Sequence, residues 1–166
     1  MPNTAIRFFQ MSTLEMSRFL GQNFYNIISC LNSKIIFIHD KTLLRKFFFD
    51  CKSLLTKNGT LILQFGNFMN FDTTGTFQIP VHKSIRVNLI SKITKNSPEE
   101  YLLSQELDRG DNHFIQILKN EPIIPITPDM VTKYAEQAGF SSITFTNGWS
   151  QESFNESTDN IVCVLR

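Results

Sequence analysis

Hydrophobic and polar residues follow two periods along this chain, one typical of strands and one typical of helices. Residues 24–30 (FYNIISC) form a nearly continuous apolar run, which predicts a strand buried on both faces. Residues 41–55 place apolar side chains at helical spacing, and Asp40 before them is a good N-cap. Residues 60–65 (TLILQF) then predict a second buried strand. Strand, helix and strand in this order indicate a βαβ unit with parallel strands and a right-handed crossover.

Capping residues mark the expected helix boundaries. Residues 12–15 (STLE) form a capping box before a short helix that Gly21 ends. Gly59 suits the left-handed position that follows the last turn of the helix over 41–55. Thr127 is expected to cap a further helix, which Gly139 ends.

The middle of the chain has a different pattern, typical of antiparallel strands with one solvated face. Residues 84–93 alternate apolar and polar side chains, and residues 101–118 carry DRGD at 108–111, a hairpin signal. We therefore expect residues 76–126 to form an antiparallel β insertion, or lid, over the edge of the sheet. Other expected extended segments are 6–9, 120–128, 141–149 and 160–166.

Composition and charge exclude several classes of function. The chain has 166 residues, of which 42% are hydrophobic and 19% charged, so we expect one globular domain over 1–166. A net charge of +1 gives no electrostatic reason to expect nucleic acid or an anionic membrane as a partner. The apolar runs are too short to span a bilayer, and no signal-peptide pattern follows Met1. The three widely spaced cysteines indicate reduced core thiols and no metal site, so we expect a cytoplasmic protein.

Polar residues follow both expected parallel strands at the points where the strands end. Asn32 comes two residues after Cys30, and Gln64 and Asn67 lie at the end of the second strand. In open α/β sheets, ligands bind outside the carboxyl ends of the strands, so these side chains are expected to face a crevice. The alternative, in which Asn32 and Asn67 satisfy backbone groups of their own loops, stays open.

The order of these motifs resembles the class I S-adenosylmethionine-dependent methyltransferase family. Residues 25–28 (YNII) resemble the F-D-x-I of the family's fourth strand, and residues 55–61 (LTKNGTL) resemble its L-x-P-G-G-x-L before the fifth. Residues 138–140 (AGF) match the A-G-F that precedes the sixth strand. Residues 30–33 (CLNS) and 63–68 (LQFGNF) are similar to motifs of bacterial small-molecule N-methyltransferases. The resemblance covers nearly the whole chain and implies an α/β fold, a Rossmann-like methyltransferase sheet with an antiparallel β insertion.

The chain also departs from the family pattern. It has no G-x-G-x-G loop and no acidic residue after a second strand, and Asn26 stands where the family commonly has Asp. Residues 6–13 resemble the family's third strand and the loop after it, so two β-α units, on the order of 60 residues, are expected to be missing before Met1. The strand at 24–30 would then be an unpaired apolar edge. We expect poor solubility, an incomplete product, or pairing of this edge with a protein partner or a second copy.

The resemblance implies which residues bind the cofactor and the substrate. S-adenosyl-L-methionine is expected to contact Ser12 and Thr13 with its adenine portion. Its methionine portion is expected to lie beside Cys30, Leu31 and Asn32. Side chains expected to orient a small-molecule methyl acceptor are His39, Gln64 and Asn67.

Two functions are consistent with this sequence. The first is methyl transfer to a small molecule by a truncated or incomplete chain, in which positioning does most of the catalysis and a general base is optional. The second is a non-catalytic methyltransferase-like subunit that acts through a protein partner. Structural roles remain the alternative for three site residues, as an N-cap for Ser12, a packing residue for Cys30 and a surface residue for His39.

Overall fold

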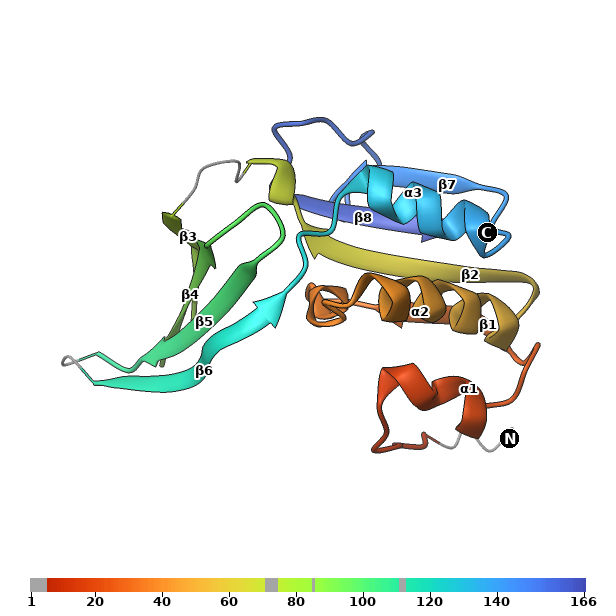
Figure 1. The fold of residues 1–166 in the computed structure, drawn as a ribbon, viewed down its shortest axis with the longest axis horizontal. Helices are drawn as coiled ribbons and strands as arrows, with labels where there is room; N and C mark the ends of the chain where they lie inside the picture. Colours follow the sequence, from red (N-terminus) through yellow and green to blue (C-terminus); the bar gives the residue numbers. More distant parts are fainter. Residues whose placement is uncertain (1–5, 71–74, 85, 111–112) are drawn as a thin grey trace.

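Two β-sheets organise the computed structural model, which describes residues 6–70, 75–84, 86–110 and 113–166 (Figure 1). In the main sheet, the strand order is β1-β2-β8-β7. β1 and β2 are parallel, while β8 is antiparallel to both of its neighbours. The strand bounds are Tyr25–Cys30 for β1, Leu55–Gly66 for β2, Ile143–Asn147 for β7 and Asn160–Leu165 for β8. This mixed α/β architecture confirms the predicted fold class.

The accessory sheet is antiparallel throughout and has the strand order β3-β4-β5-β6. It projects to one side of the main sheet (Figure 1). Its strands are β3 (Gly75–Lys83), β4 (Asn88–Lys95), β5 (Tyr101–Asp108) and β6 (Phe114–Ile123). The predicted hairpin joins β5 to β6, although β4 begins four residues later than its alternating pattern indicated. β6 also includes the first part of the segment expected to be a connector, because its backbone pairs with β5 as far as Ile123.

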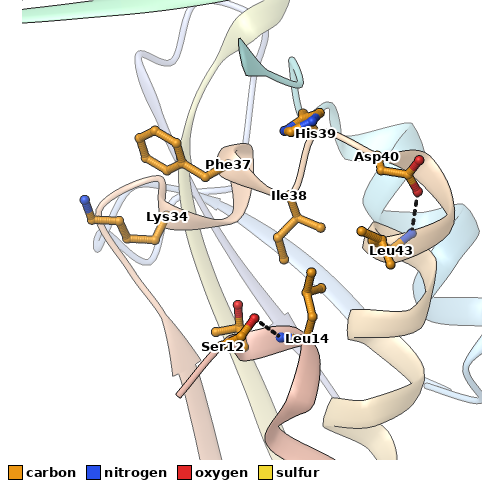
Figure 2. A pocket seen from close by; sticks show the side chains of 9 residues that line it. Ser12, Leu14, Lys34, Phe37, Ile38, His39, Asp40 and Leu43 are labelled. Carbon is orange, nitrogen blue, oxygen red and sulfur yellow. Dashed lines mark hydrogen bonds between the residues drawn. The ribbon is translucent and has the colours of Figure 1, made fainter. Parts of the chain in front are cut away.

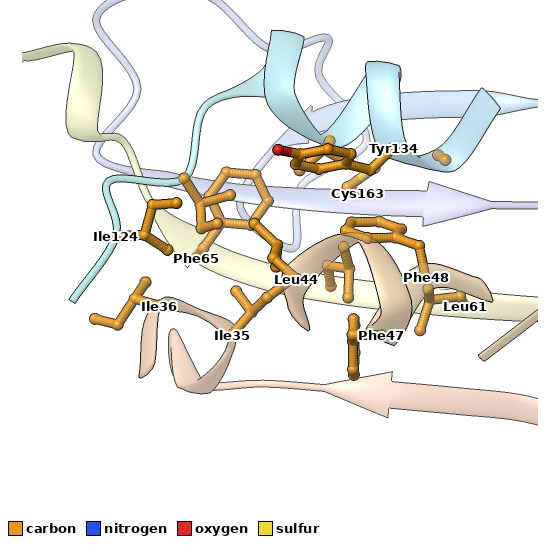
Figure 3. Packing of buried hydrophobic residues seen from close by; sticks show 14 of the residues in the cluster. Ile35, Ile36, Leu44, Phe47, Phe48, Leu61, Phe65, Ile124, Tyr134 and Cys163 are labelled. Atoms are coloured by element: carbon orange, nitrogen blue, oxygen red, sulfur yellow. The ribbon is translucent and has the colours of Figure 1, made fainter. Parts of the chain in front are cut away.

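Two helices cover one face of the main sheet, α2 (Lys41–Leu54) and α3 (Pro128–Gln137). Figure 3 shows their apolar side chains packed over β2 and β8. Side chains with no exposed surface in this layer are Leu44, Cys51, Leu54, Leu61, Leu63, Phe65, Ala135, Ile161, Cys163 and Leu165. The helical stripe predicted for α2 is therefore confirmed except at Leu43, which is 39% exposed.

Side-chain caps begin these two helices as predicted. Asp40 Oδ1 accepts a hydrogen bond from Leu43 N at 2.8 Å, and Thr127 Oγ1 accepts one from Met130 N at 3.3 Å. α3 is followed by Gly139 in the left-handed region with φ +88°, as expected for a glycine after a helix.

Residues 6–24 contain a short helical element and no strand. Ser12 Oγ accepts a hydrogen bond from Leu14 N at 3.2 Å and caps the 3₁₀ helix η1 (Thr13–Glu15), which leads into α1 (Met16–Phe19). The strand predicted for residues 6–9 is wrong, since these residues are irregular and exposed. In the described residues, no strand lies beside them to pair with their backbone.

β1 exists as predicted, but the expectation that both of its faces are buried is wrong. Ile28 and Cys30 pack against the helix-covered core, while Ile27 on the other face is 63% exposed. The reason is that no described helix covers this second face. β1 also pairs only with β2 among the described strands, so it forms an edge of the sheet.

Gly59 lies inside β2 and not at the end of a helix. α2 ends at Leu54 and the chain enters β2 directly, with Leu55 paired to Tyr25. The pairing then shifts, so that Ile27 opposes Thr60. A Cβ atom on Gly59 would lie 2.9 Å from the carbonyl oxygen of Tyr25, so this glycine allows close approach of two backbones.

Candidate functional site

A pocket lies beyond the carboxyl end of β1, between η1 and the segment that leads into α2. It has a volume of about 270 Å³, and Figure 2 shows the side chains around it. One wall comes from residues 12–14, and the other comes from residues that include the 3₁₀ helix η2 (Lys34–Phe37). Its lining residues are Ser12, Thr13, Leu14, Lys34, Phe37, Ile38, His39, Asp40 and Leu43. We call this hollow the η1–η2 pocket.

The η1–η2 pocket brings together three of the predicted site residues, Ser12, Thr13 and His39. These residues are exposed, so their polar atoms are accessible to a ligand. Sequence reasoning treated Asp40 as a cap alone, and it missed Lys34 and Phe37 as pocket residues. Lys34 Nζ lies 5.3 Å from the centroid of the Phe37 ring, which places a cation and an aromatic face at one wall.

A tight turn follows β1 and contains two consecutive left-handed residues that are not glycine. Asn32 has φ 54° and Ser33 has φ 55°, and Lys34 N donates a hydrogen bond to Leu31 O at 3.2 Å across the turn. Asn tolerates this conformation better than Ser does, so the turn holds backbone strain at Ser33.

The end of β2 fixes this strained turn. Gln64 Oε1 accepts a hydrogen bond from Asn32 N at 2.6 Å, and Gln64 O accepts one from Ser33 N at 3.0 Å. Gln64 Nε2 also donates to Asn160 Oδ1 at 3.1 Å, and Gly66 N donates to Ser33 Oγ at 3.1 Å. Asn32 and Gln64 are thus brought together where β1 and β2 end, and Gln64 supports the backbone that follows β1.

Asn67 lies apart from these residues. Its side chain is 1% exposed, its Nδ2 donates to Glu156 O at 3.0 Å, and its Oδ1 accepts from Met69 N at 3.1 Å. Both ends of the amide are therefore used by backbone groups of the surrounding loops. This geometry favours the structural alternative for Asn67 over contact with a substrate.

The two remaining predicted residues frame the start of the turn. Cys30 is half-buried against the core, and its burial raises the pKa of the thiol above the ordinary value. Leu31 is 36% exposed and directly precedes the left-handed pair. The contact of Cys30 with the core favours the packing alternative for this residue.

A second pocket of about 360 Å³ lies on the face of the main sheet opposite α2 and α3. The loop at residues 148–151 forms one side of it, and Trp149 in this loop is 67% exposed. Side chains from the sheet that line it are Ile62, Thr146, Val162 and Val164. None of the predicted site residues lies here.

Within the described ranges, no three His, Cys, Asp or Glu residues are grouped closely enough to hold a metal ion. The helices of the same ranges include none with the length and apolar character needed to cross a membrane.

Solved structures with this fold include S-adenosylmethionine-dependent methyltransferases. One from Clostridium acetobutylicum matches with a TM-score of 0.69 at 14% sequence identity, over 90% of this chain and 61% of its own. The CcbJ methyltransferase from Streptomyces caelestis matches with a TM-score of 0.71 at 14% identity, over 89% and 59%. CalS10 from Micromonospora echinaspora, an amino pentose methyltransferase with bound S-adenosylmethionine, matches with a TM-score of 0.60 at 16% identity, over 90% and 62%.

These matches show that the chain has the class I S-adenosylmethionine-dependent methyltransferase fold. The chain spans 59–62% of the length of the three solved chains. No protein-family model matches the sequence, and the search of curated proteins also finds no match.

Proposed function

We propose that this chain takes part in methyl transfer from S-adenosyl-L-methionine to a small-molecule acceptor. The observation that carries the proposal is the match of 90% of the chain to a methyltransferase fold with a TM-score of 0.69. The position of the η1–η2 pocket supports it, because ligands of open α/β sheets bind outside the carboxyl ends of the strands. Three cysteines without a disulfide support the cytoplasm as its place of action.

The η1–η2 pocket suits one part of the cofactor. Its volume of about 270 Å³ lies just below the range of ~300–1,000 Å³ that is usual for small-molecule sites. The hydroxyl groups of Ser12 and Thr13 provide donors and acceptors for an adenosine portion, and the Phe37 ring provides an apolar wall. The turn at Leu31 and Asn32, which Gln64 holds in place, would border the methionine portion.

When bound, S-adenosylmethionine supplies a methyl group that its sulfonium already activates. The protein residues then act by positioning, which brings the acceptor into line and lowers the entropic part of the barrier. In this proposal, His39 orients the acceptor at the mouth of the pocket. Gln64 acts on the ligand indirectly, because its hydrogen bonds hold the backbone of Asn32 and Ser33 in place. CalS10 is described as an amino pentose methyltransferase, which supports an amino sugar as the first acceptor to test.

A second function remains open because the given sequence contains no G-x-G-x-G motif. In this alternative, the chain is a non-catalytic methyltransferase-like subunit that acts through a protein partner. The two functions differ in whether the chain alone binds the cofactor.

Calorimetric titration with S-adenosylhomocysteine distinguishes them. The enzyme proposal expects saturable binding, and Thr13→Lys, which places a long side chain in the η1–η2 pocket, should weaken it about tenfold or more. Thr42→Lys is the matched control, since Thr42 is exposed on α2 outside the pocket. Absence of binding up to millimolar ligand would contradict the enzyme proposal for this chain and leave the subunit alternative. Transfer of a labelled methyl group to a panel of amino sugars would then test the acceptor.

A further inference from the structure

The 3₁₀ helix η2 belongs both to the wall of the η1–η2 pocket and to the buried core. Lys34 and Phe37, its first and last residues, line the pocket. Ile35 and Ile36 between them are 0% and 4% exposed, and they lie in a cluster of buried hydrophobic residues that includes both sheets. The position of this pocket wall therefore depends on what holds the buried side of η2.

The segment that joins the accessory sheet to α3 contacts the backbone of η2. Ile124, the first residue after β6, donates a hydrogen bond from its backbone N to Ile36 O at 2.9 Å. Both side chains are buried, and Figure 3 shows them in the packed cluster. Ile123 and Ile126 of the same segment are buried too. We call residues 123–126 the connector, and its hydrogen bond joins the accessory sheet directly to the pocket wall.

A second link joins the accessory sheet to the neighbouring part of this wall. Glu99 lies in the turn between β4 and β5, and its Oε1 accepts a hydrogen bond from Lys41 Nζ at 2.8 Å. Lys41 begins α2 and lies in the sequence between two residues that line the pocket, Asp40 and Leu43. The side chains of the ion pair are 59% and 79% exposed, so water and salt screen their attraction. This link is therefore weaker than the buried contact of the connector.

The accessory sheet is itself packed into the core close to the connector. Ile93 of β4 and Leu103 of β5 lie opposite each other in the two strands and are 0% and 3% exposed. Tyr101, paired with Ile123 of the connector, is 8% exposed. All of these residues belong to the cluster that contains the isoleucines of η2. Movement of the sheet away from the core would expose this apolar surface to water, which is unfavourable, so the packing favours a fixed support over a mobile lid.

We propose that Ile124 and Ile36 are positioning residues through which the accessory sheet places η2, and with it one wall of the η1–η2 pocket. The buried contact at Ile124 holds η2, while the exposed ion pair of Glu99 makes a smaller contribution. Neither isoleucine lines the pocket, so each acts on a ligand only by placing Lys34 and Phe37. The effect on ligand binding rests on the proposed function, whereas the placement of η2 can be measured without a ligand.

β2 offers an alternative support for η2. Gly66 N donates a hydrogen bond to Ser33 Oγ at 3.1 Å, and Ser33 N donates one to Gln64 O at 3.0 Å. Ile36 N then donates to Ser33 O at 3.1 Å, so the first turn of η2 is joined to the end of β2. If β2 alone held η2, a change in the connector would leave η2 as it is.

The test measures amide hydrogen exchange by NMR in the ligand-free chain. The amides of Ile36 and Ile38 report on η2, because they donate to Ser33 O and Ile35 O. Ile124→Ala truncates the buried side chain of the connector and should speed exchange at both amides about tenfold.

Leu165→Ala is the matched control for this test. It truncates a fully buried side chain of β8, where Leu165 pairs with Leu61 and Ile143. A loss of global stability alone leaves amides that exchange by local opening unchanged, so this variant should not affect Ile36 and Ile38. Ile124→Val should give a smaller increase at the same amides, and it replaces Ile124→Ala if circular dichroism shows that the alanine variant is unfolded.

Calorimetric titration with S-adenosylhomocysteine then tests the effect on the pocket. Ile124→Ala should weaken binding about threefold or more, Glu99→Gln by less than about twofold, and Leu165→Ala should bind like the unchanged chain. Equal exchange at Ile36 and Ile38 in the two alanine variants would overturn the proposal, as would faster exchange in Ile124→Ala with unchanged affinity. If the unchanged chain does not bind the ligand, the proposed function fails, and the exchange rates alone decide whether the connector places η2.

Discussion

The two faces of the main sheet are made by the same strands but lie in different environments. In β2, the side chains of Leu61, Leu63 and Phe65 have no exposed surface, while Ile62 and Gln64 between them are half-buried. α2 and α3 cover the first face, and the loop at residues 148–151 lies over part of the second. The alternation of a strand decides which side chains share a face, but the neighbouring elements decide whether that face is buried.

The largest expected difference between the two faces concerns β2 itself. Leu63→Ala removes packing from the helix-covered face and should lower the free energy of unfolding by ~2–5 kcal/mol. Ile62→Ala on the second face is the control and should cost about 1 kcal/mol or less. Urea unfolding followed by circular dichroism measures both. Equal losses would contradict the difference in burial.

A smaller effect is expected from Asn67, where β2 ends. Asn67→Ala leaves the carbonyl of Glu156 and the amide of Met69 without their side-chain partner, and it should cost ~1–3 kcal/mol of unfolding free energy. Asn58→Ala, at an exposed position, is the control and should stay within ~0.5 kcal/mol. A neutral Asn67→Ala together with weakened ligand binding would instead support the predicted contact with a substrate.

The N-cap of α2 should contribute less to the free energy of unfolding than Asn67 does. Asp40→Ala removes the acceptor for Leu43 N and should lower the free energy of unfolding by about 1 kcal/mol. Asp40→Asn keeps a side-chain oxygen at the cap and should retain most of the stability. If Asn were as destabilising as Ala, the negative charge near the helix N-terminus would matter more than the hydrogen bond.

The protonation of the buried thiols should have the smallest effect on the free energy of unfolding near neutral pH. Burial raises the pKa of Cys51 above its ordinary value of 9.0, and it raises the pKa of Cys163 to about 12. The folded state therefore prefers the neutral thiol, and this contribution to stability is full below pH 9 and is lost as the pH rises towards 12. Urea unfolding across this range should show the loss, and Cys163→Ala should make it shallower. Stability of the unchanged chain that stays constant to pH 11 would contradict burial of both thiols.

Much of the helix-covered layer could be predicted from the sequence because its signals are local. Asp40, Thr127 and the apolar spacing of α2 act within a few residues of chain, so the helices form where the pattern indicates. The expected Gly59 cap failed because the pairing of Leu55 with Tyr25 begins the strand earlier. That contact joins residues far apart in the sequence, and no local pattern shows it.

Part of the site was predictable because the strand ends that form it are also marked by local signals. The ends of β1 and β2 could be located, and Asn32 and Gln64 do meet there. The sequence did not show that Gln64 would hold backbone, or that Lys34 and Phe37 would face Ser12 across a pocket. These placements depend on the path of η2 and on the packing of α1 against α2.

The proposed function requires the cofactor to bind at the carboxyl end of β1. Titration of the ¹⁵N-labelled chain with S-adenosylhomocysteine, followed by amide chemical shifts, tests this binding. Binding at this position should give saturable shifts concentrated in residues 12–14 and 31–40, around the η1–η2 pocket. Shifts confined to residues 148–151 and the second pocket, or no shifts at millimolar ligand, would contradict it.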